Sequence, residues 1–154
     1  THHASSAASD VYKRQVATGS ISIEPIILFL IIFLWTPSHF WALSLYKSSD
    51  YKKAKIPMLP IISGTKTTKV NILFYALMML PAIIAPYFLN FASVFYLAIS
   101  SMMSAYYVYL CLRLYRSKIA SISNKIARKI FIYSIFYLFF IFLILLIDNF
   151  LKVL

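Results

Sequence analysis

Long apolar runs alternate with short basic segments along the chain, and this pattern predicts four membrane-spanning helices. The runs cover residues 25–45, 70–89, 91–112 and 130–147, and none of them contains a Lys, Arg, Asp or Glu. Each is close to the ~20 residues that a helix needs to cross a ~30 Å hydrocarbon core. Each must be helical, because a lone spanning strand would leave its backbone groups unpaired in lipid. The predicted fold is an all-α, polytopic membrane bundle.

The basic residues predict how these helices are oriented. Six lie between the first and second runs, none between the second and third, six between the third and fourth, and one after the fourth. Cytoplasmic loops carry the excess of Lys and Arg. Segments 46–69 and 113–129 are therefore predicted to be cytoplasmic. The C-terminus is predicted on the opposite side, which is the periplasm if the membrane is a bacterial inner membrane.

Composition excludes several other classes of protein. The chain is 62% hydrophobic and 12% charged, with a mean hydropathy of +0.81, which a soluble domain of this size could not bury. The net charge of +11 does not indicate nucleic-acid binding, because the cations flank apolar runs and form no polar basic face. The single Cys111 excludes an intrachain disulfide, and two glycines exclude a Gly-rich phosphate loop.

The first fifteen residues, THHASSAASDVYKRQ, differ in character from the rest. They are polar, rich in small residues and without periodicity. They do not form a signal peptide, because the basic residues do not precede a short apolar core. The string resembles translated sequencing-adapter read-through, so we expect residues 1–15 to be a non-native, disordered tail and give His2 and His3 no metal-binding role. Residues 16–154 are expected to form the membrane domain.

Asp50 is the first candidate for chemistry, because it is the only acid in the two basic segments. It follows the first apolar run, and Lys47, Lys52 and Lys53 lie beside it. A carboxylate there could hold Mg²⁺, which takes one or two protein carboxylates together with substrate phosphates. Lysines bind phosphates as point charges. The alternative interpretation is that Asp50 only relieves repulsion in a solvated basic loop.

His39 is the second candidate, because ionisable residues at membrane depth are rare and often functional. It lies about two helical turns, or ~10 Å, below the end of the first run. Trp35, one turn earlier, is predicted to share its helix face. An imidazole could bind a metal or haem iron, or hydrogen-bond a substrate. The alternative is a neutral histidine bonded to a carbonyl that the Pro37 kink has freed.

Three further patterns give structural expectations. The prolines of IPMLP, residues 56–60, are predicted to hold Ile56 and Leu59 extended, although an ordinary loop is equally consistent. Ala98, Ser101 and Ala105 are predicted to form a small-residue packing face. Asp148 is interpreted as the outer boundary of the last helix.

The stretch WTPSHFWALSLYKSSDYKKAKIPMLP, residues 35–60, resembles the signature region of the protohaem IX farnesyltransferases, a family of intramembrane aromatic prenyltransferases. Their pattern is similar to W-T-P-P-H-F-W-A-L followed by D-Y-x-x-A-G-I-P-M-L-P. The positions that match are Trp35, Thr36, Pro37, His39, Phe40, Trp41, Asp50, Tyr51, Ala54, Ile56, Pro57, Met58, Leu59 and Pro60. The resemblance extends from Val16 to Asp148. Ser38 stands where a second proline is usual, and Lys55 stands where a glycine is usual.

The resemblance implies a nine-helix enzyme of which this chain supplies the last four helices. An upstream Asp-rich loop would lie outside it, so we expect the chain alone to be inactive. The implied reaction transfers a farnesyl group from farnesyl diphosphate to a vinyl group of haem b, giving haem O, with Mg²⁺ neutralising the diphosphate. Haem b would be a substrate rather than a cofactor.

The resemblance also implies roles for individual residues. Asp50 would be the catalytic, magnesium-binding residue, and the substrate-binding residues would be Trp35, His39, Lys47, Tyr51, Lys52 and Lys53. The implied partners are the lipid bilayer and, among proteins, haem A synthase or terminal-oxidase assembly proteins. A quinone-precursor prenyltransferase and a non-enzymatic membrane subunit remain the alternatives.

Overall fold

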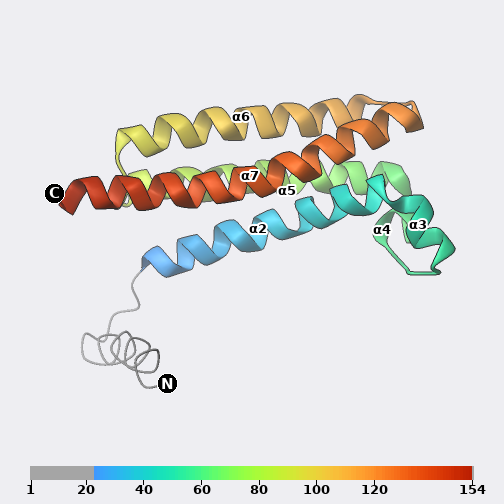
Figure 1. Ribbon diagram of the computed structural model, residues 1–154, viewed down its shortest axis with the longest axis horizontal. Helices are drawn as coiled ribbons and strands as arrows, with labels where there is room; N and C mark the ends of the chain where they lie inside the picture. Colours follow the sequence, from blue (N-terminus) through green and yellow to red (C-terminus); the bar gives the residue numbers. More distant parts are fainter. Residues whose placement is uncertain (1–22, 154) are drawn as a thin grey trace, which may run out of the picture.

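The computed structural model describes residues 23–153, and the predicted tail 1–15 lies outside them. Four long helices dominate this part of the chain: α2 (Ile23–Tyr46), α5 (Gly64–Phe88), α6 (Val94–Arg116) and α7 (Ala120–Val153) (Figure 1). Two short helices, α3 (Ser48–Lys53) and α4 (Leu59–Ile62), connect α2 to α5. The described residues contain no strand. The prediction of an all-α fold is confirmed.

The four long helices pack as a ring in which each contacts two neighbours. The pairs whose backbones contact are α2 with α5, α5 with α6, α6 with α7, and α7 with α2, whereas the backbones of the diagonal pairs in this part of the chain lie farther apart. The α2–α5 connection and the α6–α7 turn lie at one end of the bundle, and the α5–α6 turn lies at the other, with the end of α7 (Figure 1). This arrangement agrees with the alternation of basic and uncharged connections.

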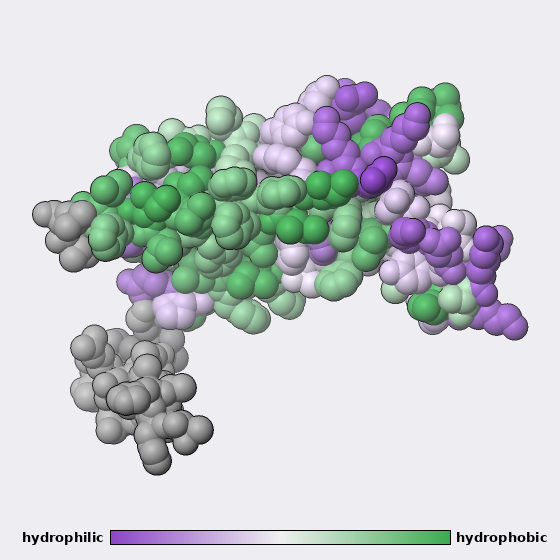
Figure 2. All heavy atoms as spheres, in the orientation of Figure 1, coloured by the Kyte–Doolittle hydropathy of each residue, from purple (hydrophilic) through white to green (hydrophobic). Residues whose placement is uncertain are grey.

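The outer surface of the bundle has the apolar sides that a membrane protein requires. Hydrophilic residues gather at the end that carries α3 and α4, and the sides of the bundle are mostly apolar (Figure 2). All four long helices are long and apolar enough to cross a membrane. Many large apolar side chains are exposed on their sides, among them Phe29, Phe33, Phe136, Phe139 and Leu146. The chain is therefore a multi-pass integral membrane protein.

The helices are longer than the apolar runs that predicted them. Helix α5 begins at Gly64 rather than at residue 70, and α7 begins at Ala120 rather than at residue 130. Most of segment 113–129 is helical, and only residues 117–119 separate α6 from α7. An apolar run reports the depth of the hydrocarbon, whereas the backbone hydrogen bonds continue into the interface, where Lys and Arg favour helix. At 34 residues, α7 is about 50 Å long and exceeds the hydrocarbon thickness.

Helix α6 packs through a different face from the predicted one. Ala98, Ser101 and Ala105 are all exposed in the described structure, so the prediction of a small-residue packing face is wrong there. The face that packs instead carries Tyr96, Ser100, Ser104, Tyr107, Leu110, Cys111 and Leu114. Its tyrosines are accommodated because groups on neighbouring helices satisfy their hydroxyls: Tyr107 bonds the Ser38 hydroxyl of α2 at 2.7 Å, and Tyr96 donates to the Ile83 carbonyl of α5 at 3.0 Å.

Asp148 has a structural role that the sequence did not reveal. It does not mark the end of the last helix, because α7 continues to Val153. Its carboxylate is buried and accepts hydrogen bonds from the backbone N–H of Ser93, at 2.7 Å, and from the Ser93 hydroxyl. Ser93 is the N-cap of α6 and also accepts from the N–H of Phe95. A carboxylate from α7 thus completes the N-terminus of α6, where negative charge is favourable.

Candidate functional site

His39 lies in an aromatic sandwich at the boundary between α2 and α7. The imidazole stacks on Trp35 of the same helix, with ring centroids 4.3 Å apart and an interplanar angle of 20°. Phe131 of α7 stacks on the other side at 4.7 Å and 28°. The residue is buried. The prediction that Trp35 and His39 share one helix face is confirmed, and the two aromatic walls fix the plane of the imidazole.

Ser134 of α7 anchors both predicted residues. The Ser134 hydroxyl lies 2.6 Å from the His39 Nδ1 atom, and the Ser134 carbonyl accepts a 2.9 Å hydrogen bond from the indole N–H of Trp35. The partner of His39 is thus a serine hydroxyl on another helix and not a carbonyl that Pro37 has freed. We call Trp35, His39, Phe131 and Ser134 the histidine cluster.

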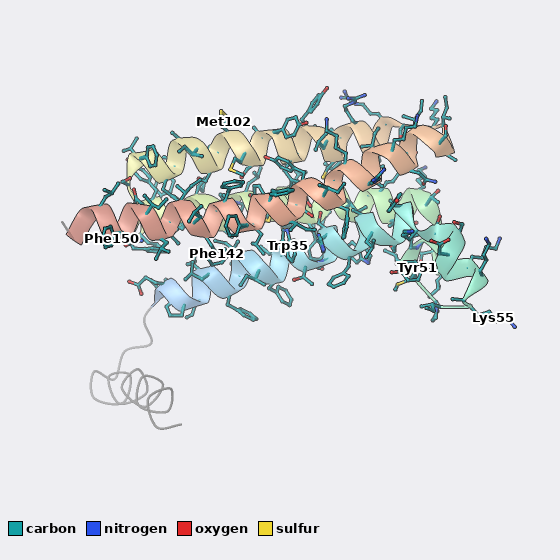
Figure 3. The ribbon with its side chains drawn as sticks, in the orientation of Figure 1. Trp35, Tyr51, Lys55, Met102, Phe142 and Phe150 are labelled. Carbon is teal, nitrogen blue, oxygen red and sulfur yellow. The ribbon has the colours of Figure 1, made fainter. Side chains whose placement is uncertain are left out.

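An apolar groove adjoins the histidine cluster between α2 and α7. It has a volume of about 520 Å³, and Trp35 is one of its lining residues. Figure 3 shows Trp35 of α2 and Phe142 of α7, both of which line the groove, on the facing sides of these helices. The other lining residues are Ile32, Ile135, Leu138, Phe139, Leu143 and Leu146. This surface is suited to a flat or elongated apolar group.

The predicted cations and the acid lie in a surface loop, residues 47–63, which follows α2 directly. Asp50 is in the first turn of α3, and Lys52 and Lys53 are in its last turn. The Lys47 ammonium lies 3.1 Å from the Asp50 carboxylate, and both side chains are about half exposed, at 47% and 58%. The hydrogen bond and the positive charge of Lys47 hold the pKa of Asp50 below its usual range. This pairing is consistent with either interpretation of Asp50.

The structure also indicates how much of a metal site the described residues supply. Within residues 23–153 there is no group of three or more His, Cys, Asp or Glu side chains that could hold a metal ion. Asp50 therefore fits magnesium only as a single carboxylate ligand. That is sufficient for an ion that takes its remaining ligands from water and substrate phosphates.

One of the three predicted lysines lines a hollow of its own. The hollow measures about 310 Å³ and combines a cation with hydroxyl groups; it is lined by Ser48, Ser49, Lys52, Pro60, Ile61 and Thr65. We call it the Lys52 hollow. Lys47, Asp50 and Lys53 do not line it, and Tyr51 is half-buried in α3 beside it. An ammonium beside several hydroxyls is a reasonable site for a phosphate group.

The turn after α3 explains the glycine of the family pattern. Lys55 has a φ of +55°, in the left-handed region that favours glycine. The N–H of Ile56 donates to the carbonyl of Tyr51, and the N–H of Lys55 donates to that of Lys52. These two bonds define a Schellman motif with Lys55 at the position that usually carries glycine. The lysine here adopts a strained backbone conformation.

The proline segment is only partly extended. Met58 is extended, with a ψ of 155°, but Leu59 begins α4, so the prediction of an extended Leu59 is wrong. Pro60 is compatible with the first turn of a helix, where a backbone N–H is not needed. Pro60 is buried, and α4 contacts both α2 and α5. The segment therefore holds the surface loop against the bundle.

The two groups of predicted residues lie at different depths, one on α2 and the other in the loop just beyond its end. His39 lies about 10 Å along α2 from Tyr46, the last residue of that helix. The surface loop begins immediately afterwards, so the histidine cluster lies inside the apolar region and the Lys52 hollow lies at its basic end. This separation suits an amphipathic substrate.

Several residues of the site were not predicted from the sequence. Ser134 and Phe131 lie on α7, and Ser48, Ser49 and Thr65 line the Lys52 hollow. Ser134 does carry a signal, because it is the only serine within the apolar run 130–147. Polar side chains in membrane helices commonly hydrogen-bond across helices. The spacing of residues along the sequence did not show that Ser134 would bind His39.

Comparison with known proteins identifies the family. Residues 12–135 match the model of the UbiA prenyltransferase family. The chain belongs to the UbiA prenyltransferase family. Its polytopic helical membrane fold is that of a UbiA family member. No solved structure matches the chain at a significant level.

Among similar UbiA family proteins are several curated bacterial relatives. The chain is 56% identical over 146 residues to a protein from Pelagibacter ubique named Protoheme IX farnesyltransferase, covering 95% of this chain and 48% of the relative. Proteins of the same name from Parvibaculum lavamentivorans and Rickettsia bellii are 46% and 43% identical, covering 86% and 83% of this chain and 42% of each relative. The chain spans about half the length of the curated relatives that it matches.

Proposed function

We propose that this chain forms part of a protohaem IX farnesyltransferase, which transfers a farnesyl group from farnesyl diphosphate to a vinyl group of haem b and gives haem O. The observation that carries the proposal is the arrangement on α2, where a buried imidazole in an apolar, aromatic setting lies about 10 Å below a basic surface loop. The names of relatives up to 56% identical support the same reaction.

The two depths correspond to the polar and the apolar groups of the proposed substrates. The diphosphate of an isoprenoid is a polar group that stays at the membrane surface, whereas its hydrocarbon chain partitions into lipid. Lys52 and the hydroxyls of its hollow would bind the diphosphate. The aromatic walls and the apolar groove beside Trp35 would bind the flat, apolar face of the porphyrin.

The role of this chain in the reaction is electrostatic and positional. The bond between farnesyl C1 and the diphosphate oxygen breaks with its electron pair on the oxygen, and the π electrons of the vinyl group form the new bond to C1. The other vinyl carbon is left as a cation, to which water adds with loss of a proton, so that the product carries a hydroxyl group there. Lys52 stabilises the negative charge that develops on the diphosphate. The histidine cluster holds the acceptor ring so that the vinyl carbon approaches C1.

Asp50 is the residue of this chain that would hold magnesium. The ion, when bound with the diphosphate, supplies positive charge that stabilises the departing group. The Asp50 carboxylate is exposed at the surface and has a lowered pKa, so it is ionised at neutral pH and available to a cation. Lys47, its present partner, can move to the diphosphate when the ion binds Asp50.

We place the chain in the inner membrane of a bacterium. Surface loop 47–63 and the α6–α7 turn would face the cytoplasm of a bacterium, and the end of α7 would face the periplasm. The excess of Lys and Arg at the end of the bundle that carries the surface loop and the α6–α7 turn supports this orientation. Haem A synthase and terminal-oxidase assembly proteins are the proposed protein partners, because they would handle the product.

Two other functions are the alternatives for this chain. A quinone-precursor prenyltransferase of the same family would use the same basic loop, but the cited relatives bear the protoheme name. A non-enzymatic membrane subunit would need neither the Lys52 hollow nor the histidine cluster. Haem O formation decides between these functions and the proposed one.

The test is a chimaera that joins this chain to the upstream half of the Pelagibacter ubique relative. Membranes that contain the chimaera should convert haem b and farnesyl diphosphate into haem O, measured by chromatography with mass detection. Asp50→Ala should abolish product while the protein still inserts, and Lys66→Ala, a matched change outside the Lys52 hollow and the histidine cluster, should retain it. An inactive chimaera or a fully active Asp50→Ala variant would contradict the proposal. The chain without the upstream half should form no haem O.

A further inference from the structure

The hydrogen bonds of Ser134 restrict which ring nitrogen of His39 carries a proton. The Ser134 hydroxyl is 2.6 Å from the His39 Nδ1 atom and 2.7 Å from the carbonyl oxygen of Phe131, one helical turn earlier. A hydroxyl has one proton, and a carbonyl can only accept. Both contacts are hydrogen bonds only if Ser134 donates to the Phe131 carbonyl and accepts from His39. The imidazole must then carry its proton on Nδ1.

The second ring nitrogen keeps a lone pair that no described residue uses. Among the residues that the structure describes, no group hydrogen-bonds to Nε2 of His39, and no buried side-chain nitrogen or oxygen lacks a partner. Nε2 therefore reaches the molecular surface of the described bundle. Stacking on Trp35 and Phe131 prevents the ring from turning its nitrogens around.

We infer that Ser134 is a positioning residue that fixes His39 as the Nδ1–H tautomer, so that Nε2 is presented as a ligand for the iron of a porphyrin. The inference rests on the proposed function, which supplies the porphyrin. Histidines that bind metals almost always donate their other N–H to a neighbouring acceptor, which fixes the tautomer and raises the basicity of the ligating nitrogen. The Ser134 hydroxyl supplies that acceptor, and its bond to the Phe131 carbonyl keeps its lone pairs turned towards His39.

The tautomer can be read directly by nitrogen-15 NMR of the chain in phospholipid nanodiscs with labelled histidine. His39→Ala identifies the His39 signals among those of His2 and His3. The unaltered chain should show His39 as the Nδ1–H form. Ser134→Ala should give a mixture of tautomers, and Ser134→Thr, which keeps the hydroxyl, should retain the Nδ1–H form. Ser104→Ala removes a buried serine hydroxyl that bonds Tyr137, so it is the matched control and should leave His39 unchanged.

Ferric protoporphyrin IX is the probe for the iron-binding part. Its absorption spectrum should change on binding to the chain, and Ser134→Ala should weaken binding about tenfold or more, the loss typical when the group behind a metal-ligating histidine is removed. Ser134→Thr and Ser104→Ala should bind as the unaltered chain does. The inference is overturned if His39 is the Nε2–H form, if Ser134→Ala keeps the Nδ1–H form, or if His39→Ala leaves the spectrum unchanged.

These outcomes are distinguishable from failure of the proposed function. The tautomer is measured without porphyrin or farnesyl diphosphate, whereas the function is judged by haem O formation in the chimaera. An active chimaera with an unaltered porphyrin spectrum in His39→Ala would overturn the inference alone. An inactive chimaera with the expected tautomers would count against the function alone.

Discussion

Ser38 of α2 and Tyr107 of α6 join their hydroxyls at 2.7 Å across the diagonal of the bundle. Helices α2 and α6 are not neighbours in the described ring, so this bond crosses its centre. Both residues are fully buried. Ser38 occupies the position at which the family pattern has a second proline. The departure from that pattern thus has a specific partner, because a proline could not supply the hydroxyl.

We expect Tyr107→Phe to lower the free energy of unfolding by about 1 kcal/mol, the usual net value of one buried hydrogen bond. The change removes only the phenolic oxygen and leaves Ser38 with the carbonyl of Ile72 at 3.5 Å, a longer and weaker contact. Denaturation in mixed detergent micelles measures the loss. A double-mutant cycle with Ser38→Ala should show coupling, and independent effects would mean that the bond does not contribute.

We expect Lys55→Gly to be more stable than Lys55→Ala by about 1 kcal/mol, because only glycine adopts the left-handed conformation without a steric cost. Both changes remove the same charge, so alanine is the matched control for the lysine side chain. Equal stability of the two variants would show that the turn after α3 does not adopt a φ near +55°. Thermal denaturation of the two variants under identical conditions provides the comparison.

We expect Lys47→Gln to raise the pKa of Asp50 towards its usual value, because the hydrogen bond and the positive charge that lower it are lost. Because the pKa of Asp50 is lower in the folded protein than in the unfolded chain, its ionised carboxylate stabilises the folded state at a pH above the unfolded pKa. That stabilisation is lost as the pH falls through the folded pKa. Carbon-13 NMR titration of the Asp50 carboxyl measures the change. Lys55→Gln, at an exposed lysine in the same loop, should leave the titration where it is.

We expect Lys52→Ala in the chimaera to raise the KM for farnesyl diphosphate about tenfold, as loss of one charged phosphate contact would do. Lys52 lines the hollow with hydroxyl groups, whereas its neighbour Lys53 does not. Lys53→Ala therefore removes the same charge from the same helix and should change KM much less. Steady-state kinetics of haem O formation measures both KM values. Equal KM values for the two variants would contradict a role of Lys52 in binding the diphosphate.

The sequence predicted the number of membrane helices well, because this number depends on local composition. The apolar runs did not indicate where α5 and α7 begin, since helical hydrogen bonding continues past the hydrocarbon. The Trp35–His39 stack followed from a four-residue spacing, but Ser134 did not, because it is brought to His39 by the packing of α7 on α2. The resemblance identified the glycine position now held by Lys55, and only the backbone showed why glycine is usual there.

The bond between Ser93 and Asp148 has a consequence for how the protein is made. The acceptor for the N-cap residue of α6 lies 55 positions later in the chain. When α6 first emerges from the ribosome and enters the membrane, its acceptor has not yet been synthesised. The N-terminus of α6 must therefore rely on lipid headgroups or water until α7 has crossed the bilayer. Insertion of the last helix and completion of the preceding one are a single event, and a chain that stops before Asp148 would leave the N–H and hydroxyl of Ser93 without this acceptor.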